Sequence, residues 1–450
     1  MNKKSLSLLL VLGLIFVPSY LFAENDEFVS KEEADLIKKI EETPRIGNNV
    51  PSLMKGYISD HIPPNVNIGR YEEDTDEKIL ETAKKYKPAN IEDYAKVFCP
   101  QIIKETKKPK QSNPPTIEQL TQMPGMPSFK VLRDTVRFWS CWLRLMLEEE
   151  GNDNAALVVT YAGYYVAKDI ESSYACSSDL LSKNIAIGIS GISSNELLLW
   201  ANKPRMKSAK LSKYLAQDLI ELVNSEYPFS SCIRFDKALI YSVCYEGAKN
   251  GNENTKLFID NVIKSNYFKE SINLFFILPK KFIDKPYYIC KKELEDYESK
   301  AYKKEHEISQ NMEDLSKKVE ELQKNSDSFD ESQINPEWVI KIFVGQIFSM
   351  GSVCYSQPKK IHEIKLAKME MVAIALAYNA FYCENNKEPA NMEELENWFG
   401  RKMPVNRFTG KPYVLYSEKG YALYNYGIED QKDDEKNEMK SDFFFKFLAK

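Results

Sequence analysis

The chain has 450 residues, of which 61 are Lys or Arg, 66 are Asp or Glu and 43% are hydrophobic, and its formal net charge is −5. Proteins that bind nucleic acid carry clustered lysines and arginines that neutralise phosphates, so this mildly acidic, mixed balance argues against a nucleic-acid partner. The length exceeds one typical hydrophobic core, and we therefore expect two or three domains.

Residues 1–23 have the pattern of a secretory signal peptide. Lys3 and Lys4 make the start positive, residues 6–22 are mainly apolar, and the small residue Ala23 stands directly before Glu24. A basic start, a short apolar core and a small residue at the boundary are typical of a cleaved signal. We expect cleavage after Ala23, which removes two lysines and no acid and changes the net charge from −5 to about −7. The expected location is the periplasm or the outside of the cell.

An uncleaved anchor helix is the alternative for this segment. Pro18 interrupts the apolar run, which is also short for a bilayer span of about 20 residues. If cleavage fails, this segment is the contact with the membrane that we expect.

Residues 24–127 form an irregular, Pro-rich N-terminal region. Frequent prolines break helices and favour extended connections. Short helices are still expected near Lys31–Glu42 and Asp76–Tyr86, and Lys107–Pro115 is interpreted as a linker.

Residues 128–357 are expected to form an α-helical domain. Apolar residues recur there at steps of three and four, which predicts amphipathic helices. Asn152-Asp153-Asn154 is expected to cap one of them. The predicted helices cover residues 129–147, 155–170, 180–200, 208–223, 235–248 and 287–325.

The last of these, Tyr287–Asn325, is long and highly charged. A heptad seam runs through Ala301, Ile308 and Met312, but Glu298 occupies an earlier seam position, so the seam is short. We interpret the segment as one arm of a helical hairpin or a long packed helix, with a dimerising coiled coil as the alternative.

All eight cysteines follow the signal segment, and an even number in an exported chain predicts disulfides. Eight cysteines allow 105 pairings, so the connectivity stays open. No C-x-x-C occurs and the chain has three histidines, so neither a zinc site nor a thioredoxin-like site is expected. His362, which opens a predicted helix, is interpreted as a surface or capping residue.

The C-terminal part begins with a helix whose apolar stripe runs from Ile364 to Tyr382. The segment Met403–Tyr413 follows and contains Pro404, Asn406, Gly410 and Pro412. Alternating apolar residues on both sides of a Gly-containing turn then predict a β-hairpin, with strands at residues 414–416 and 421–427.

This order resembles the globular region of the major pseudopilins of type II secretion, which contains the pattern P-x-D-P-x-x-G-x-P-Y before a hairpin. The resemblance implies a small α+β domain over residues 358–430, followed by a charged and aromatic tail over residues 431–450. Asn406 replaces the usual acid of the pattern, whereas Asp430 matches the acid of the final loop. In pseudopilins that loop can hold calcium, which implies Asp430, Asp433 and Asp434 as ligands here. Because Gln431 stands where glycine is usual, a solvated acidic tail is the alternative.

The middle of the chain resembles a group of bacterial envelope proteins that place a helical domain ahead of the same pseudopilin-like end. The similar segments are residues 178–188, Tyr227-Pro228-Phe229 and Asn335-Pro336. The fold class expected for the whole chain is mainly α, a multi-helix body with a small α+β end.

We expect a non-enzymatic envelope protein, a scaffold or adaptor whose partners are envelope or secretion-related proteins. Pseudopilins need a membrane-embedded N-terminal helix to polymerise, and none is joined to the pseudopilin-like part, so a fibre subunit is not expected. No cofactor other than calcium is implied.

The alternative is a hydrolase that acts on an envelope polymer. The run Glu148-Glu149-Glu150 contains candidates for a general acid. However, the run closes a predicted helix, where we expect it to be solvated. No G-x-S-x-G motif occurs, so no nucleophilic serine is indicated and no catalytic residue is assigned.

Overall fold

The computed structural model describes residues 75–86, 91, 94–107, 129–171, 180–201, 209–325, 336–349, 354–416, 421–425 and 442–446. The described part is mainly helical, as the sequence predicts. Several expectations lie outside it: the signal segment 1–23, the helix near Lys31–Glu42, the aspartates at 430, 433 and 434, and the linker Lys107–Pro115 except for Lys107, which ends a helix.

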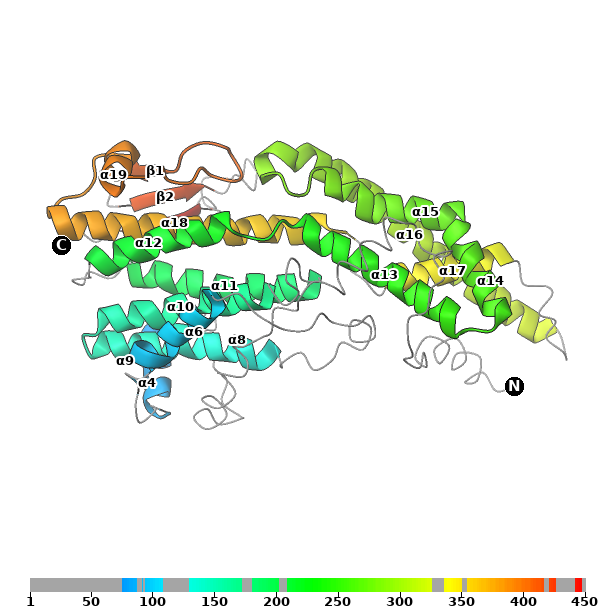
Figure 1. The fold of residues 1–450 in the computed structure, drawn as a ribbon, viewed down its shortest axis with the longest axis horizontal. Helices are drawn as coiled ribbons and strands as arrows, with labels where there is room; N and C mark the ends of the chain where they lie inside the picture. Colours follow the sequence, from blue (N-terminus) through cyan, green and yellow to red (C-terminus); the bar gives the residue numbers. More distant parts are fainter. Residues whose placement is uncertain are drawn as a thin grey trace.

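One group of helices packs around α10 and α11 (Figure 1). Its core contains large aromatic side chains that are almost completely buried, among them Trp139, Trp142 and Tyr161. Trp139 and Trp142 lie in the π-helical segment η2, whose six residues are all buried. The group consists of α4 (Asp76–Lys84), η1 (Tyr94–Phe98), α6 (Cys99–Lys107), α8 (Phe129–Arg137), η2 (Phe138–Leu143), α9 (Arg144–Glu149), α10 (Asp153–Glu171), α11 (Leu180–Ala201) and α12 (Ala209–Asn224).

A second group extends to the other end of the elongated molecule (Figure 1). Short polar residues begin several of its helices: Asn252 accepts a hydrogen bond from the Thr255 backbone N–H, and Ser265 accepts one from Phe268. The group consists of α13 (Ser230–Asn250), α14 (Glu253–Lys264), α15 (Asn266–Ile272), η3 (Asn273–Ile277), η4 (Pro279–Lys281), α16 (Tyr287–Asn325) and α17 (Pro336–Ser349).

The long helix α18 (Ser356–Asn385) joins the two groups. At its start, the Tyr355 hydroxyl donates to Asp236 of the second group at 3.1 Å, and the Tyr355 backbone N–H donates to the Tyr297 hydroxyl at 3.3 Å. Further along, α18 packs extensively against α12 and α11 of the first group (Figure 1). Side chains on most sides of α18 are therefore buried, and the helix is a structural core element.

The apolar seam of α16 packs against other helices of the same chain. Ala301 is fully buried and Ile308 is nearly so, and α17 packs against this helix. The ammonium of Lys304 lies 4.0 Å from the ring centroid of Tyr267 on α15, a cation–π contact. At these positions α16 is a packed arm of the second group, the first of the two interpretations made from the sequence.

Near the C-terminal end of α18 lie α19 (Met392–Phe399) and three short strands, β1 (Val414–Tyr416), β2 (Tyr421–Asn425) and β3 (Asp442–Lys446). The strands are antiparallel in the order β1-β2-β3, with Leu415 opposite Ala422 and Leu423 opposite Phe444. The strand β3 falls within residues 431–450, the charged and aromatic tail of the sequence analysis.

Seven of the eight cysteines are described, and no disulfide joins any two of the seven, so the disulfides expected from the sequence are not found among them. Burial raises the pKa of the Cys99 thiol well above its usual value. Cys176 lies outside the described residues.

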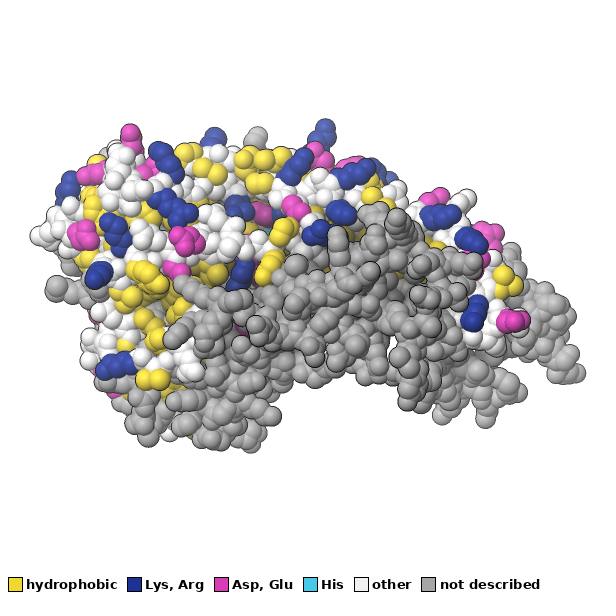
Figure 2. Space-filling model, viewed as in Figure 1, with side chains coloured by type: hydrophobic (Ala, Val, Ile, Leu, Met, Phe, Trp, Pro, Cys, Tyr) yellow, Lys and Arg dark blue, Asp and Glu magenta, His cyan; other side chains and the backbone are white. Residues whose placement is uncertain are grey.

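On the surface shown in Figure 2, positive and negative side chains are interspersed over the described residues. This distribution agrees with the mixed charge of the sequence. Among the described helices, none combines the length and the hydropathy that crossing a membrane requires.

Candidate functional site

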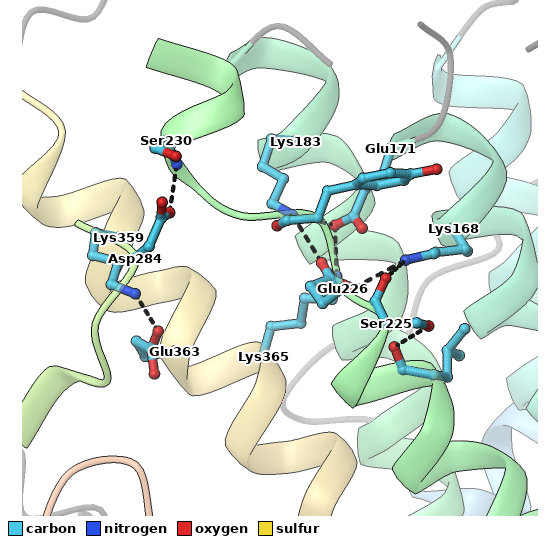
Figure 3. A network of polar contacts seen from close by, with 12 residues as sticks. Lys168, Glu171, Lys183, Ser225, Glu226, Ser230, Asp284, Lys359, Glu363 and Lys365 are labelled. Carbon is cyan, nitrogen blue, oxygen red and sulfur yellow. Dashed lines mark hydrogen bonds and ion pairs between the residues drawn. The ribbon is translucent and has the colours of Figure 1, made fainter. Parts of the chain in front are cut away.

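Five charged side chains meet where the two groups of helices join, and we call them the ion cluster. They come from three helices and one linker, and Figure 3 shows them pointing toward one another. None of the five side chains is more than 15% exposed. The members are Lys168 and Glu171 of α10, Lys183 of α11, Glu226 after α12, and Lys365 of α18.

The two glutamates of the ion cluster share two ammonium groups. Lys183 Nζ lies 2.8 Å from Glu226 Oε1 and 3.2 Å from Glu171 Oε1. Lys365 Nζ lies 2.7 Å and 2.6 Å from the same two oxygens. A buried charge is tolerated only when it is compensated, so removal of Lys183 or Lys365 leaves both glutamates with one ammonium fewer.

The lysines set the protonation of this cluster. Burial opposes ionisation of Glu226, but Lys183 and Lys365 outweigh it and hold the pKa of this carboxyl well below its usual value. Burial and the charge of Glu226 together raise the pKa of Glu171. Glu226 is therefore the carboxyl of the cluster whose ionised form the two lysines favour.

The same lysines hold the linker 225–229 between α12 and α13. Lys168 Nζ donates to the Ser225 carbonyl at 2.7 Å and lies 4.5 Å from the ring centroid of Tyr227. Lys183 Nζ donates to the Tyr227 carbonyl at 3.4 Å. The chain thus crosses from one group of helices to the other through a segment held by side chains from α10, α11 and α18 (Figure 3).

His362 is buried beside this cluster, whereas the sequence interpretation placed it at a surface or cap. Its ring lies 5.4 Å, centroid to centroid, from the ring of Phe229. Burial and the charge of Lys183 lower the pKa of His362 well below its usual value, so the imidazole is neutral. The interpretation was wrong because α18 is covered on this side by the linker that carries Phe229.

A second polar contact ties residues 401–413 to α18. Arg407 Nε lies 2.7 Å from Glu370 Oε1, and Arg407 Nη1 lies 3.5 Å from Glu363 Oε2. The Tyr413 hydroxyl donates to Glu370 Oε2 at 2.6 Å. Glu363 also pairs with Lys359, one turn earlier on α18. We call Arg407, Glu370, Glu363 and Tyr413 the Arg407 contact.

A third buried group, which we call the Arg144 triad, consists of Arg144, Glu148 and Glu196. Arg144 is fully buried, and its Nη1 and Nη2 lie 2.7 Å from Glu148 and 2.6 Å from Glu196. Its Nε donates to the Ser140 carbonyl at 2.9 Å. The expectation that the run 148–150 is solvated is therefore wrong for Glu148. The exposed Glu149 pairs with a lysine of α4 at 2.6 Å.

An open hollow of about 430 Å³ lies where α11, α16 and α18 meet. Its lining is uncharged, and Ile361 and Tyr302 on its rim are 40% and 54% exposed. The remaining lining residues are Asn184, Ile187, Gly188, Cys354, Gln357 and Pro358.

The candidate calcium ligands Asp430, Asp433 and Asp434 lie outside the described residues, so the structure does not bring them together or separate them. Within the described ranges, no three His, Cys, Asp or Glu side chains are grouped as metal ligands would be.

Sequence reasoning missed every member of the ion cluster, although a signal existed. Lys183 and Glu196 are the two charged residues of α11, an otherwise uncharged helix of 22 residues. A single charge inside an apolar stretch indicates a buried partner. Comparison of the chain with protein-family models, curated proteins and solved structures finds no match.

Proposed function

We propose that this protein is a non-enzymatic scaffold or adaptor of the bacterial cell envelope, located in the periplasm or outside the cell, with envelope or secretion-related proteins as partners. The observation that carries the proposal is the chain of buried ion pairs along α18. The ion cluster connects α18 to α10, α11 and the linker after α12, and the Arg407 contact connects it to residues 401–413. Buried ion pairs fix these helices relative to one another, and binding surfaces on rigid elements are well suited to assembling partners.

We further propose that α18, α19 and the strands form a pseudopilin-like α+β end. Support comes from the segment that carries the resemblance. Asn406 Oδ1 accepts hydrogen bonds from the backbone N–H groups of Phe408 at 2.8 Å and Thr409 at 3.2 Å. Asparagine supplies the same side-chain oxygen as the acid of the pseudopilin pattern, so the replacement is compatible with the turn.

Gly410 supports the same interpretation. Its φ is +69°, a conformation that favours glycine, and a Cβ there would lie 2.7 Å from the ring of Tyr288. The positive φ and the nearby Tyr288 ring therefore explain why the pattern has glycine at position 410 of this chain. Calcium binding by Asp430, Asp433 and Asp434 remains a separate proposal, tested by calcium titration of the protein.

The hydrolase alternative gains no specific support. It depends on a carboxylic acid in the run 148–150 that is available to a substrate. Glu148 is engaged with Arg144, and Glu149 is engaged with Lys84.

The test is partner capture from envelope extracts with a C-terminal deletion whose boundary the structure sets. Deletion from residue 361 would remove most of α18 and Lys365, and thereby the core. Deletion of residues 414–450 retains Arg407 and Tyr413, and with them their contacts with Glu370 of α18. We expect this deletion to abolish capture of envelope proteins while helicity is retained. Leu257→Glu, at a position that is 61% exposed on α14, is the control and should capture as the wild type does. An unchanged partner set after the deletion would contradict the proposal.

Export is tested separately with residues 1–30 fused to alkaline phosphatase, which is active only outside the cytoplasm. We expect an active fusion, and a mature protein whose first residue is Glu24. Leu10→Arg in the same fusion should abolish activity, because it interrupts the apolar run. An inactive wild-type fusion would refute the proposed location.

A further inference from the structure

The outward side of α11 forms one continuous face, which we call the neutral face. Its members are spaced by three or four residues, so they fall on one side of the helix over a length of about 27 Å. Leu181 and Leu199 at its ends are 49% and 36% exposed. The face consists of Leu181, Asn184, Gly188, Gly191, Ile192, Asn195 and Leu199, each exposed or half-buried.

The neutral face contains no charged residue, although 28% of the residues of the chain are charged. A lysine of α18, Lys368, lies at its edge and donates to Asn195 Oδ1 at 3.0 Å. The two charged residues of α11 point inward: Lys183 joins the ion cluster and Glu196 joins the Arg144 triad. The surface in Figure 2, by contrast, carries interspersed charges of both signs. Away from Lys368, a partner of the neutral face therefore has to be uncharged at the contact, since a desolvated charge would find no counter-ion on this side of α11.

The order of residues on the neutral face is nearly the same in both directions. A second copy that runs antiparallel, with its centre between Ile189 and Ser190, places Asn184 opposite Asn195 and Gly188 opposite Gly191. Leu181 then lies opposite Leu198, which is next to Leu199 in the chain. The Asn195 oxygen already accepts from Lys368, so the pairing uses the Asn195 amide N–H as donor and the Asn184 oxygen as acceptor, and a twofold axis repeats every contact.

The centre of the face is open. A Cβ placed on Gly188 or on Gly191 meets no atom within 4 Å, so a second helix can approach closely there. The hollow beside Asn184 and Gly188 adds the exposed Ile361 and Tyr302 to the apolar area. This extension matters because a specific dimer buries on the order of 1,000 Å² or more in total, which is more than one helix face supplies.

We infer that the neutral face is the interface of a homodimer in which α11 packs antiparallel against α11 of a second copy. The absence of charged residues within the face, the near-palindromic order and the open centre together favour this occupant, because a copy of the same face satisfies all three. The inference concerns self-association and does not depend on the proposed adaptor role.

The test is sedimentation equilibrium of the full chain with a charge placed at the centre of the face. Gly188→Glu has space in the monomer and improves helix propensity, so folding is retained. We expect wild type and the control Leu257→Glu to be dimers and Gly188→Glu to be a monomer with unchanged circular dichroism. A monomeric wild type at about 100 μM, where an interface of Kd near 10 μM would be formed, overturns the inference. A dimer that survives Gly188→Glu also overturns it.

The antiparallel alignment has its own test. Gly191→Lys should also be monomeric, because it places an unpaired charge opposite Gly188 of the other copy. An equimolar mixture of Gly188→Glu and Gly191→Lys should form a heterodimer, since the new charges lie opposite each other in the antiparallel arrangement. A mixture that stays monomeric rules out this alignment.

Discussion

Lys365 Nζ of α18 lies 2.7 Å from Glu226 Oε1 in the linker between α12 and α13, although 139 positions separate the two residues in the chain. The contact joins the helix that leads to the C-terminal end with the segment where the chain passes from one group of helices to the other. Both side chains are almost completely buried, so the pair is coupled to the folding of both groups.

Substitution Lys365→Ala is expected to destabilise the protein by about 3–5 kcal/mol, because it leaves Glu171 and Glu226 buried with one ammonium fewer. Urea denaturation followed by circular dichroism measures the difference. Lys264→Ala is the matched control: its ion pair with Asp260 is on the surface, and its loss should cost less than about 1 kcal/mol. Equal effects of the two substitutions would show that the buried lysine has no special role.

His362 is expected to make stability depend on pH. Its pKa is lowered in the folded protein, whereas an unfolded histidine has a pKa of about 6.5, so the unfolded chain binds the proton more readily. Stability is therefore fully present above pH 6.5 and decreases as the pH falls below it, by up to about 1.4 kcal/mol per pH unit. In His362→Phe, which retains the ring against Phe229, this slope between pH 6.5 and 5 should be smaller, as measured by urea denaturation at each pH. A slope equal to that of the wild type would indicate that His362 is protonated in the folded state.

Asn406 is expected to act through its side-chain oxygen. Asn406→Ala removes the acceptor for the Phe408 and Thr409 N–H groups and should destabilise the protein by about 1–2 kcal/mol, whereas Asn406→Asp should have a much smaller effect. Thermal unfolding of the two variants side by side measures the difference. If aspartate is as harmful as alanine, the parallel drawn between Asn406 and the pseudopilin acid fails.

In the Arg144 triad, the loss of stability on removing Arg144 is expected to depend on whether Glu148 and Glu196 are still present. Arg144→Met leaves Glu148 and Glu196 buried without a cation, and we expect a loss of about 3–5 kcal/mol. Adding Glu148→Leu and Glu196→Leu should restore much of the stability, because an apolar triplet of similar volume suits this core. Chemical denaturation of the single and the triple variant tests this. A triple variant that is less stable than Arg144→Met would show that the glutamates have partners more important than the arginine.

The boundaries of the helices could be predicted to a large extent from the sequence. The charged helix predicted over 287–325 is α16, and the helix predicted from Ala155 begins two residues earlier, where Asn152 Oδ1 accepts from the Ala155 N–H at 3.4 Å. Such features depend on residues within one or two turns of each other, and hydrophobic spacing and caps are local properties that a linear pattern records.

The partners of the buried charges were decided by the tertiary structure. On α11, Lys183 lies at the end of the first turn, where the helix dipole disfavours a positive charge, and Glu196 lies in the second half of the helix. Glu171 and Glu226 gather around the lysine, and Arg144 binds the glutamate, so contacts from other helices outweigh the local preference. No local pattern contains this information, because the energy of a buried charge depends on which distant side chains the packing brings within about 3 Å of it.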